Sequence, residues 1–287
     1  MKFCRRPKQC IESLGLRRAL QNYIEGFAGR SAIVTTLNRS MVKSNLDHSM
    51  QENSPQDAAK RTAAAKAIET FLQDGMTIGL GSGSTSRWFV RILGDRVKAG
   101  LRVVGVPSSK STGELAQEVG VPLADLNDVE QLDLTIDGAD EIDAKGRMIK
   151  GGGANLLWEK IVASASRKMV AIVDESKRVQ RLGRFPLPVE VVPFAWRSTE
   201  RQLQNLFKTS GFTGVRIDVR GSTEKPLITD SGHYLLDCHL KEIADPDSLA
   251  AKLNLIPGVV EHGLFIGIAT DAVIGKTDGT AETLAFS

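Results

Sequence analysis

The order in which strand-like and helix-like segments follow one another constrains the fold of this chain most. Between residues 54 and 173, short apolar runs alternate with longer segments in which apolar residues recur every three or four positions. This alternation predicts an α/β fold with a mostly parallel sheet and helices on both faces, because parallel strands need crossover connections. The expected strands are residues 76–81, 101–106, 132–136 and 169–173, and the expected helices are residues 58–72, a segment around 88–93, 111–119 and 154–166.

A second, smaller domain is predicted from residue 186 onward. The segment FPLPVEVVP contains three prolines, which is typical of a crossing between domains. We expect a small α+β domain at 186–259, inserted into a Rossmann-like α/β domain of residues 54–185 and 260–287, with the apolar run 263–274 returning to the main sheet. Its expected elements are a helix at 199–209, a strand at 214–219, a hairpin of 226–229 with 234–240 across Asp230-Ser231-Gly232, and a helix at 246–253.

Residues 1–53 differ in character from the rest of the chain. They lack a sustained apolar period, and residues 1–50 carry nine Lys or Arg against three Asp or Glu. Their Arg-rich, acid-poor composition is compatible with an organelle transit peptide. A disordered extension, or a start codon placed upstream of the true one, is favoured, because Met41 and Met50 lie just before the first clear element. That element begins with Ser54 as a helix N-cap and Pro55 at the first helical position.

Composition and charge exclude several classes of protein. The net charge is +3, of which residues 1–50 contribute +6, so the remaining chain carries −3 and shows no basic stripe for nucleic acid. No apolar stretch is long enough to span a bilayer. The three cysteines form no CxxC pair, which fits a reducing compartment such as the cytoplasm. The four histidines are scattered and show no HxH or HExxH spacing, so neither zinc nor a Ser-His-Asp triad is indicated.

A glycine-rich turn, GLGSGSTS at 79–86, lies between the first expected strand and the next helix. Glycines let the backbone approach a ligand, and the start of a helix offers free N–H groups to an anion. Ser82, Ser84 and Thr85 add hydroxyl donors beside Gly83. Ser84 stands where a dinucleotide fingerprint has its last glycine, so a phosphate monoester fits better than a nicotinamide cofactor. A plain tight turn explains the motif about as well.

Charged residues follow the later strands. Asp137 and Asp140 come after the strand 132–136, at the edge where open α/β sheets bind ligands. Lys150 precedes three glycines, whose entropic cost indicates a close approach of the backbone to something, and Glu159 lies about a turn and a half into the following helix. Lys177 follows the strand 169–173. Taken singly, these residues also fit a solvated acidic loop, an exposed helix glutamate and surface lysines.

The order and wording of the motifs together carry more information than any one of them. GLGSGSTS, IDGADEID, MIKGGGANLLWEKIVA, VDESK, FPLPVEVVP and IPGVVEHGLF closely resemble the A-type ribose-5-phosphate isomerases, over residues 61–279. The resemblance implies a homodimeric enzyme that interconverts ribose 5-phosphate and ribulose 5-phosphate in the non-oxidative pentose phosphate pathway. It also implies catalysis without a metal or cofactor and a location in the cytoplasm, or in an organelle if residues 1–53 act as a transit peptide.

The resemblance also implies roles for individual residues. Glu159 falls on the family's general base, and Lys150 is expected to stabilise the enediolate. Asp137, with Asp140, is expected to shuttle protons and open the furanose ring. Trp158 departs from the family, which often has a polar or basic residue there. The residues expected to bind the substrate are Ser82, Gly83, Ser84, Thr85, Asp137, Gly138, Ala139, Asp140, Lys150, Gly151, Gly152, Gly153 and Lys177.

Two other functions fit parts of the sequence. A non-catalytic sugar-phosphate sensor of a related fold would use the phosphate turn, but it would need a DNA-binding module, and residues 1–53 show no convincing helix-turn-helix. A nicotinamide-dependent dehydrogenase would need the missing glycine and a ribose-binding acid. The joint presence of Asp137, Lys150 and Glu159 favours the isomerase.

Overall fold

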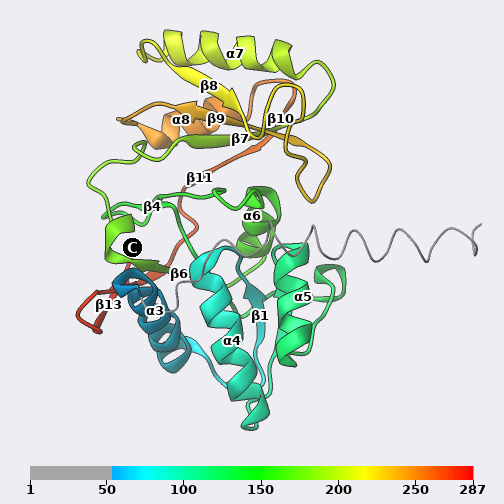
Figure 1. Ribbon diagram of the computed structural model, residues 1–287, viewed down its shortest axis with the longest axis vertical. Coiled ribbons are helices and arrows are strands. Elements are labelled where there is room, and N and C mark those ends of the chain that lie inside the picture. Colours follow the sequence, from blue (N-terminus) through cyan, green and yellow to red (C-terminus); the bar gives the residue numbers. More distant parts are fainter. Residues whose placement is uncertain (1–53, 287) are drawn as a thin grey trace, which may run out of the picture. The chain divides into compact units, whose positions relative to one another are not determined.

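The computed structural model describes residues 54–286, and the extension predicted for residues 1–53 lies outside them (Figure 1). A six-stranded sheet forms the centre of the α/β part, in the order β13-β12-β6-β3-β1-β2. All neighbouring strands in it run parallel except β13, which is antiparallel to β12. Its strands are β1 (Thr77–Leu80), β2 (Val104–Pro107), β3 (Leu134–Asp137), β6 (Met169–Asp174), β12 (Asp271–Gly275) and β13 (Ala281–Ala285).

Helices cover both faces of this sheet, as the alternating sequence predicts. Leu134 and Ile136 of β3 point to the face where buried residues of α3, α4 and α5 pack. Thr135 points to the other face, where its hydroxyl lies 3.5 Å from the carbonyl oxygen of Val162 in α6. The Ser54 side chain accepts a hydrogen bond from the Asp57 N–H and so caps α3. These helices are α3 (Pro55–Phe71), α4 (Ser84–Lys98), α5 (Lys110–Val119) and α6 (Leu156–Ser164).

A four-stranded antiparallel sheet, in the order β10-β7-β9-β8, follows in the second half of the chain. Its apolar face packs on two helices, in a core that includes Leu203 and Phe207 of α7 and Leu249 and Leu253 of α8. We propose that a small domain begins at residue 186 and extends past the expected end at residue 259 to His262, because β10 pairs with β7 up to that residue. The elements are β7 (Leu187–Val191), α7 (Trp196–Thr209), β8 (Arg216–Val219), β9 (Tyr234–His239), α8 (Pro246–Leu253) and β10 (Val259–His262).

A third, short sheet joins the segment between β3 and α6 to the chain that leaves the small sheet. Its order is β11 (Leu264–Phe265), β5 (Met148–Ile149) and β4 (Glu141–Ile142), and both pairings are antiparallel. The Lys150 N–H donates to the Gly263 carbonyl at 2.9 Å, and the Gly263 N–H donates to the Pro188 carbonyl at 2.8 Å. The backbone at Lys150 is therefore bonded to the segment that returns from the small sheet.

One predicted pairing is wrong. Residues 226–229 were expected to form a hairpin with 234–240, but β9 pairs with β8 and β7 instead. Pro226 has no N–H to donate to a strand ladder, and Ile228 is 66% exposed. The turn itself exists, because the Gly232 N–H donates to the Thr229 carbonyl at 2.9 Å.

One strand was not predicted from the sequence because it contains a proline. The proline-rich segment that was interpreted as a domain crossing contains β7, and Pro188 is a residue of that strand.

The apolar run 263–274 returns to the main sheet, as predicted, through β12, which pairs in parallel with β6. Across residues 54–286, no helix combines the length and apolar character needed to cross a membrane.

Candidate active site

The carboxyl ends of β1 and β3 bring the predicted site residues together. The glycine-rich turn leaves β1, Asp137 is the last residue of β3, and Glu159 lies in the first turn of α6. Lys150 follows β5 directly. In α/β sheets this edge is where ligands bind, because the loops and helix starts converge there.

Asp137 is held by hydrogen bonds on one oxygen and by a charge on the other. Its Oδ1 accepts from the Ser82 N–H at 2.9 Å, the Gly138 N–H at 2.7 Å and the Ser86 hydroxyl at 3.0 Å. Its Oδ2 lies 2.9 Å from Lys150 Nζ. A Cβ on Gly81 would lie 2.2 Å from Oδ1, so the turn needs glycine at this position to pass the carboxylate.

Glu159 and Lys150 complete a buried cluster with Asp137. The Ser82 hydroxyl donates to Glu159 Oε1 at 2.5 Å, and Lys150 Nζ lies 3.4 Å from Glu159 Oε2. The exposed fractions are 1% for Asp137, 2% for Lys150 and 4% for Glu159. Glu159 is therefore buried, whereas its position on a helix beside Lys160 fits an exposed residue when the motif is taken alone.

The charges of the cluster shift the pKa of two members. Burial raises the pKa of Glu159 to about 7, against the opposing effect of the Lys150 ammonium, and the nearby Asp137 carboxylate adds to the rise. Burial alone would lower the pKa of Lys150, but the carboxylates of Asp137 and Glu159 outweigh it and raise that pKa to about 12. The cluster thus holds a permanent cation beside a carboxyl group that can gain or lose a proton near neutral pH.

Three oxygens lie around the Lys150 ammonium. Nζ donates to the Gly138 carbonyl at 2.6 Å and lies near one oxygen each of Asp137 and Glu159. Asp140 lies beside this group, where its Oδ2 accepts from the Gly152 N–H at 2.7 Å and so links the acidic loop to the glycine loop.

The remaining predicted residues surround the cluster. Gly83 has φ of 89°, a conformation that favours glycine, and it is the N-cap of α4, where Ser84 is exposed and Thr85 is buried. The first turn of α4 contains no acidic residue, so its N-terminal N–H groups can receive an anion. Lys177 ends the short 3-10 helix η2 (Glu175–Lys177) and lines a cavity of about 180 Å³ together with Asp140.

Three further residues support the site but were not predicted. Ser86 donates to Asp137, and its spacing in the GLGSGSTS motif could have indicated it. The Asn155 side-chain amide donates to the Gly153 carbonyl at 2.9 Å. Arg220 follows β8 and donates to the Gly151 carbonyl at 2.7 Å, a contact for which the sequence holds no local signal.

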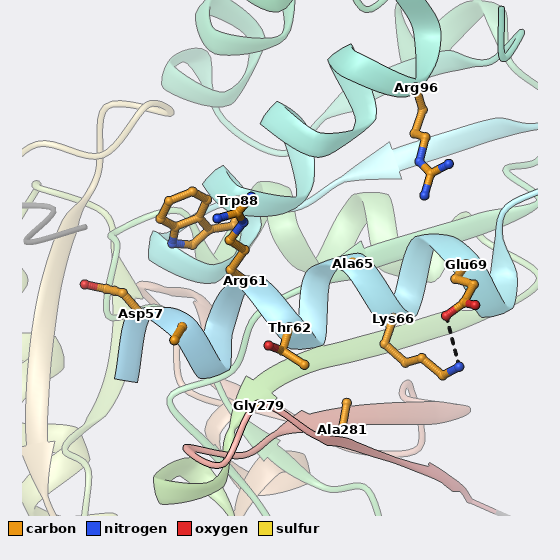
Figure 2. Close-up of a pocket in the computed structure, with 11 residues that line it drawn as sticks. Asp57, Arg61, Thr62, Ala65, Lys66, Glu69, Trp88, Arg96, Gly279 and Ala281 are labelled. Atoms are coloured by element: carbon orange, nitrogen blue, oxygen red, sulfur yellow. Dashed lines mark hydrogen bonds and ion pairs between the residues drawn. The ribbon is translucent and has the colours of Figure 1, made fainter. Parts of the chain in front are cut away.

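Another cavity lies away from this cluster. Figure 2 shows it between α3, α4 and β13, with a volume of about 780 Å³. Arg61 lies over the Trp88 ring, 5.8 Å from its centre, and Lys66 pairs with Glu69 at 3.0 Å. None of the predicted site residues lines it. Within residues 54–286, His, Cys, Asp and Glu side chains form no group that could hold a metal ion.

Comparisons with known proteins agree with the family that the motifs resemble. The model of the family Ribose 5-phosphate isomerase A (phosphoriboisomerase A) matches residues 104–279. Ribose-5-phosphate isomerase A 2 of Yersinia pseudotuberculosis is 52% identical over 227 residues, which cover 79% of this chain and 96% of the relative.

Solved structures show the same fold. The crystal structure of ribose 5 phosphate isomerase A from Neisseria gonorrhoeae is 40% identical, with a TM-score of 0.73 over 81% of this chain and 98% of that chain. A D-ribose-5-phosphate isomerase in complex with phospho-erythronic acid is 36% identical, with a TM-score of 0.74 over 80% of this chain and 99% of that chain. The chain therefore belongs to the ribose 5-phosphate isomerase A family.

Proposed function

We propose that this protein interconverts ribose 5-phosphate and ribulose 5-phosphate through a cis-enediolate, as a step of the non-oxidative pentose phosphate pathway. The observation that carries the proposal is the buried carboxyl group of Glu159, whose pKa is raised to about 7 beside Lys150 and Ser82. A general base works best when its pKa lies near the operating pH. The mutual placement of these residues favours the enzyme over a sugar-phosphate sensor, which needs no base.

Glu159 is the proposed base. In its ionised form it takes the proton from C2 of the open-chain sugar and returns it to C1. The transfer neutralises Glu159 and places the negative charge on the enediolate oxygens. Lys150 already faces Glu159 Oε2 at 3.4 Å, so its ammonium is placed to stabilise the charge as it moves to the substrate.

Asp137 and Asp140 are the proposed proton shuttles for ring opening and for exchange between O1 and O2. The phosphate is proposed to lie at the start of α4, near Gly83, Ser84 and Thr85, with Lys177 as a further cation. Binding energy at the phosphate then positions the reacting carbons. The relative solved with phospho-erythronic acid supports a small phosphorylated ligand for this fold.

We further propose a homodimer in the cytoplasm. The family resemblance implies the dimer, and Phe194 and Leu255, which are 88% and 80% exposed, are proposed to be covered by the second subunit. Light scattering after size-exclusion chromatography tests the dimer, and a monomer at micromolar concentration would refute it. Mass spectrometry of the N-terminus from native cells tests whether residues 1–53 remain in the mature protein.

The test of function is proton NMR of ribose 5-phosphate in D2O with EDTA. Three proteins are compared: wild type, Glu159→Gln and the control Glu118→Gln, which changes an exposed glutamate of α5. We expect wild type and the control to form ribulose 5-phosphate with deuterium entering the sugar, while Glu159→Gln loses nearly all turnover. No conversion by folded wild type would refute the isomerase, and near-normal turnover in Glu159→Gln would remove Glu159 as the base.

A further inference from the structure

A turn of the small sheet, residues 229–233, is bonded to a buried carboxylate of β7. Glu190 of β7 is 1% exposed, and its Oε1 accepts from the Thr229 hydroxyl at 2.8 Å. The same oxygen lies 3.0 Å from His233 Nδ1. The Thr229 hydroxyl also accepts from the His233 N–H at 3.1 Å. Both ends of the turn are therefore tied to one side chain of the sheet.

One residue at the tip of this turn binds the first N–H of a helix of the α/β part, whose N-cap is Ser109. Asp230 Oδ2 accepts a hydrogen bond from the backbone N–H of Lys110 at 2.9 Å, and Lys110 Nζ donates to the Asp230 carbonyl at 3.2 Å. Lys110 is the first residue of α5. A carboxylate at a helix N-terminus satisfies a free N–H and interacts favourably with the helix dipole.

The next residue at the tip contacts the helix that carries the proposed base. The Trp158 indole N–H donates to the Ser231 hydroxyl at 2.8 Å, and Trp158 directly precedes Glu159 on α6. The connection between β8 and β9, which contains the turn, reaches toward α6 (Figure 1).

The two helices that the turn contacts are both bonded to the glycine-rich turn. In α5, the Thr112 hydroxyl donates to the Gly81 carbonyl at 3.1 Å, so this helix is bonded to the glycine-rich turn. In α6, Glu159 accepts from Ser82 of that same turn. A displacement of α6 against α5 would therefore lengthen the contact between Ser82 and Glu159.

We propose that residues 229–233 form a clasp that sets the position of Glu159 by holding the first turns of α5 and α6. The proposal rests on the isomerase function proposed above. Trp158, Asp230 and Ser231 act as positioning residues, since they act through α5 and α6. Proton abstraction is sensitive to displacements of about 1 Å, so loss of the clasp lowers kcat more than it changes KM.

Matched variants separate the hydrogen bond from the side chains that make it. Trp158→Phe removes the donor, Ser231→Ala removes the acceptor, and Ser231→Thr keeps a hydroxyl. We expect each of the first two to lower kcat about three- to tenfold, as for the loss of one hydrogen bond, with KM within about twofold. The double variant Trp158→Phe/Ser231→Ala should resemble either single variant, and Ser231→Thr should retain the wild-type kcat.

Three kinetic outcomes would overturn the clasp. An unchanged kcat in both single variants would leave the contact without a catalytic effect. A raised KM with unchanged kcat would assign Trp158 and Ser231 to substrate binding. Single effects that multiply in the double variant would show that the two side chains act independently.

Amide hydrogen exchange tests the clasp independently of enzyme activity, because it measures the protection of individual backbone N–H groups. We expect the Lys110 amide, and the Glu159 amide that donates to the Asn155 carbonyl at 3.0 Å, to exchange faster in Asp230→Ala than in wild type, and Asp230→Asn, which keeps an acceptor, to protect Lys110. Unchanged exchange in Asp230→Ala would overturn the clasp whatever the activity. If wild type showed no isomerase activity, the proposed function would fail and the exchange result alone would decide whether the turn holds the two helices.

Discussion

Replacing Glu159 by Gln should make the protein more stable at alkaline pH, although it removes the proposed base. Burial raises the pKa of Glu159 from 4.5 to about 7, so ionising this group in the folded protein costs about 3 kcal/mol more than in the unfolded chain, at 1.36 kcal/mol per pH unit. A carboxyl group with a raised pKa contributes fully to stability below its unfolded value. The contribution is lost as the pH rises from about 4.5 through about 7.

Glutamine cannot ionise, so Glu159→Gln should escape this loss. The difference in the free energy of unfolding between variant and wild type should increase in favour of the variant by about 2 to 3 kcal/mol between pH 5 and pH 8. Urea unfolding followed by circular dichroism at several pH values measures it, and other titrating groups cancel in the difference. The exposed Glu118→Gln should give curves parallel to wild type. Parallel curves for Glu159→Gln as well, or a difference of opposite sign, would refute the reasoning about the buried cluster.

Three further predictions concern the same cluster. The value of kcat/KM should rise with pH to a plateau with an apparent pKa of about 7, and a flat profile from pH 5 to 9 in stopped assays would exclude Glu159 as the titrating base. Lys150→Ala should lower kcat about 10²- to 10³-fold with little change in KM, whereas a change in KM alone would mark Lys150 as a binding residue. Gly81→Ala places a Cβ 2.2 Å from Asp137 Oδ1, so it should abolish turnover and cost about 1–3 kcal/mol in urea unfolding, and wild-type values of both would contradict the close approach.

The starts of two helices were predictable because their signals are local. Ser54 and Pro55 mark the start of α3, and the helix 246–253 was located at the bounds it has, where Asp245 accepts from the Ser248 N–H. The pairing of the small sheet was not predictable in this way. The turn at Asp230–Gly232 was evident in the sequence, but which strands pair beside it depends on contacts between distant segments.

The site shows the same division between local and distant information. The GLGSGSTS turn could be interpreted from its own residues, whereas the burial of Glu159 results from the approach of Lys150 and Ser82 from other parts of the chain. The family resemblance supplied the role of Glu159, and no periodicity or spacing could have done so. Arg220 could not be found at all, because its contact with the glycine loop exists only once the small sheet is in place.

The bond between Lys150 and Gly263 makes the small sheet a mechanical part of the charged cluster. Gly263 directly follows β10. A Cβ on Gly263 would lie 2.3 Å from the Lys150 carbonyl oxygen, so the backbones at Gly263 and Lys150 approach too closely for any other residue at position 263. We therefore expect a tilt of β10 to shift the main chain at Lys150 and to change the distances between its ammonium and both carboxylates. Lengthening the chain by one residue between His262 and Leu264 should break the hydrogen bond between Lys150 and Gly263, and so separate the small sheet from the charged cluster.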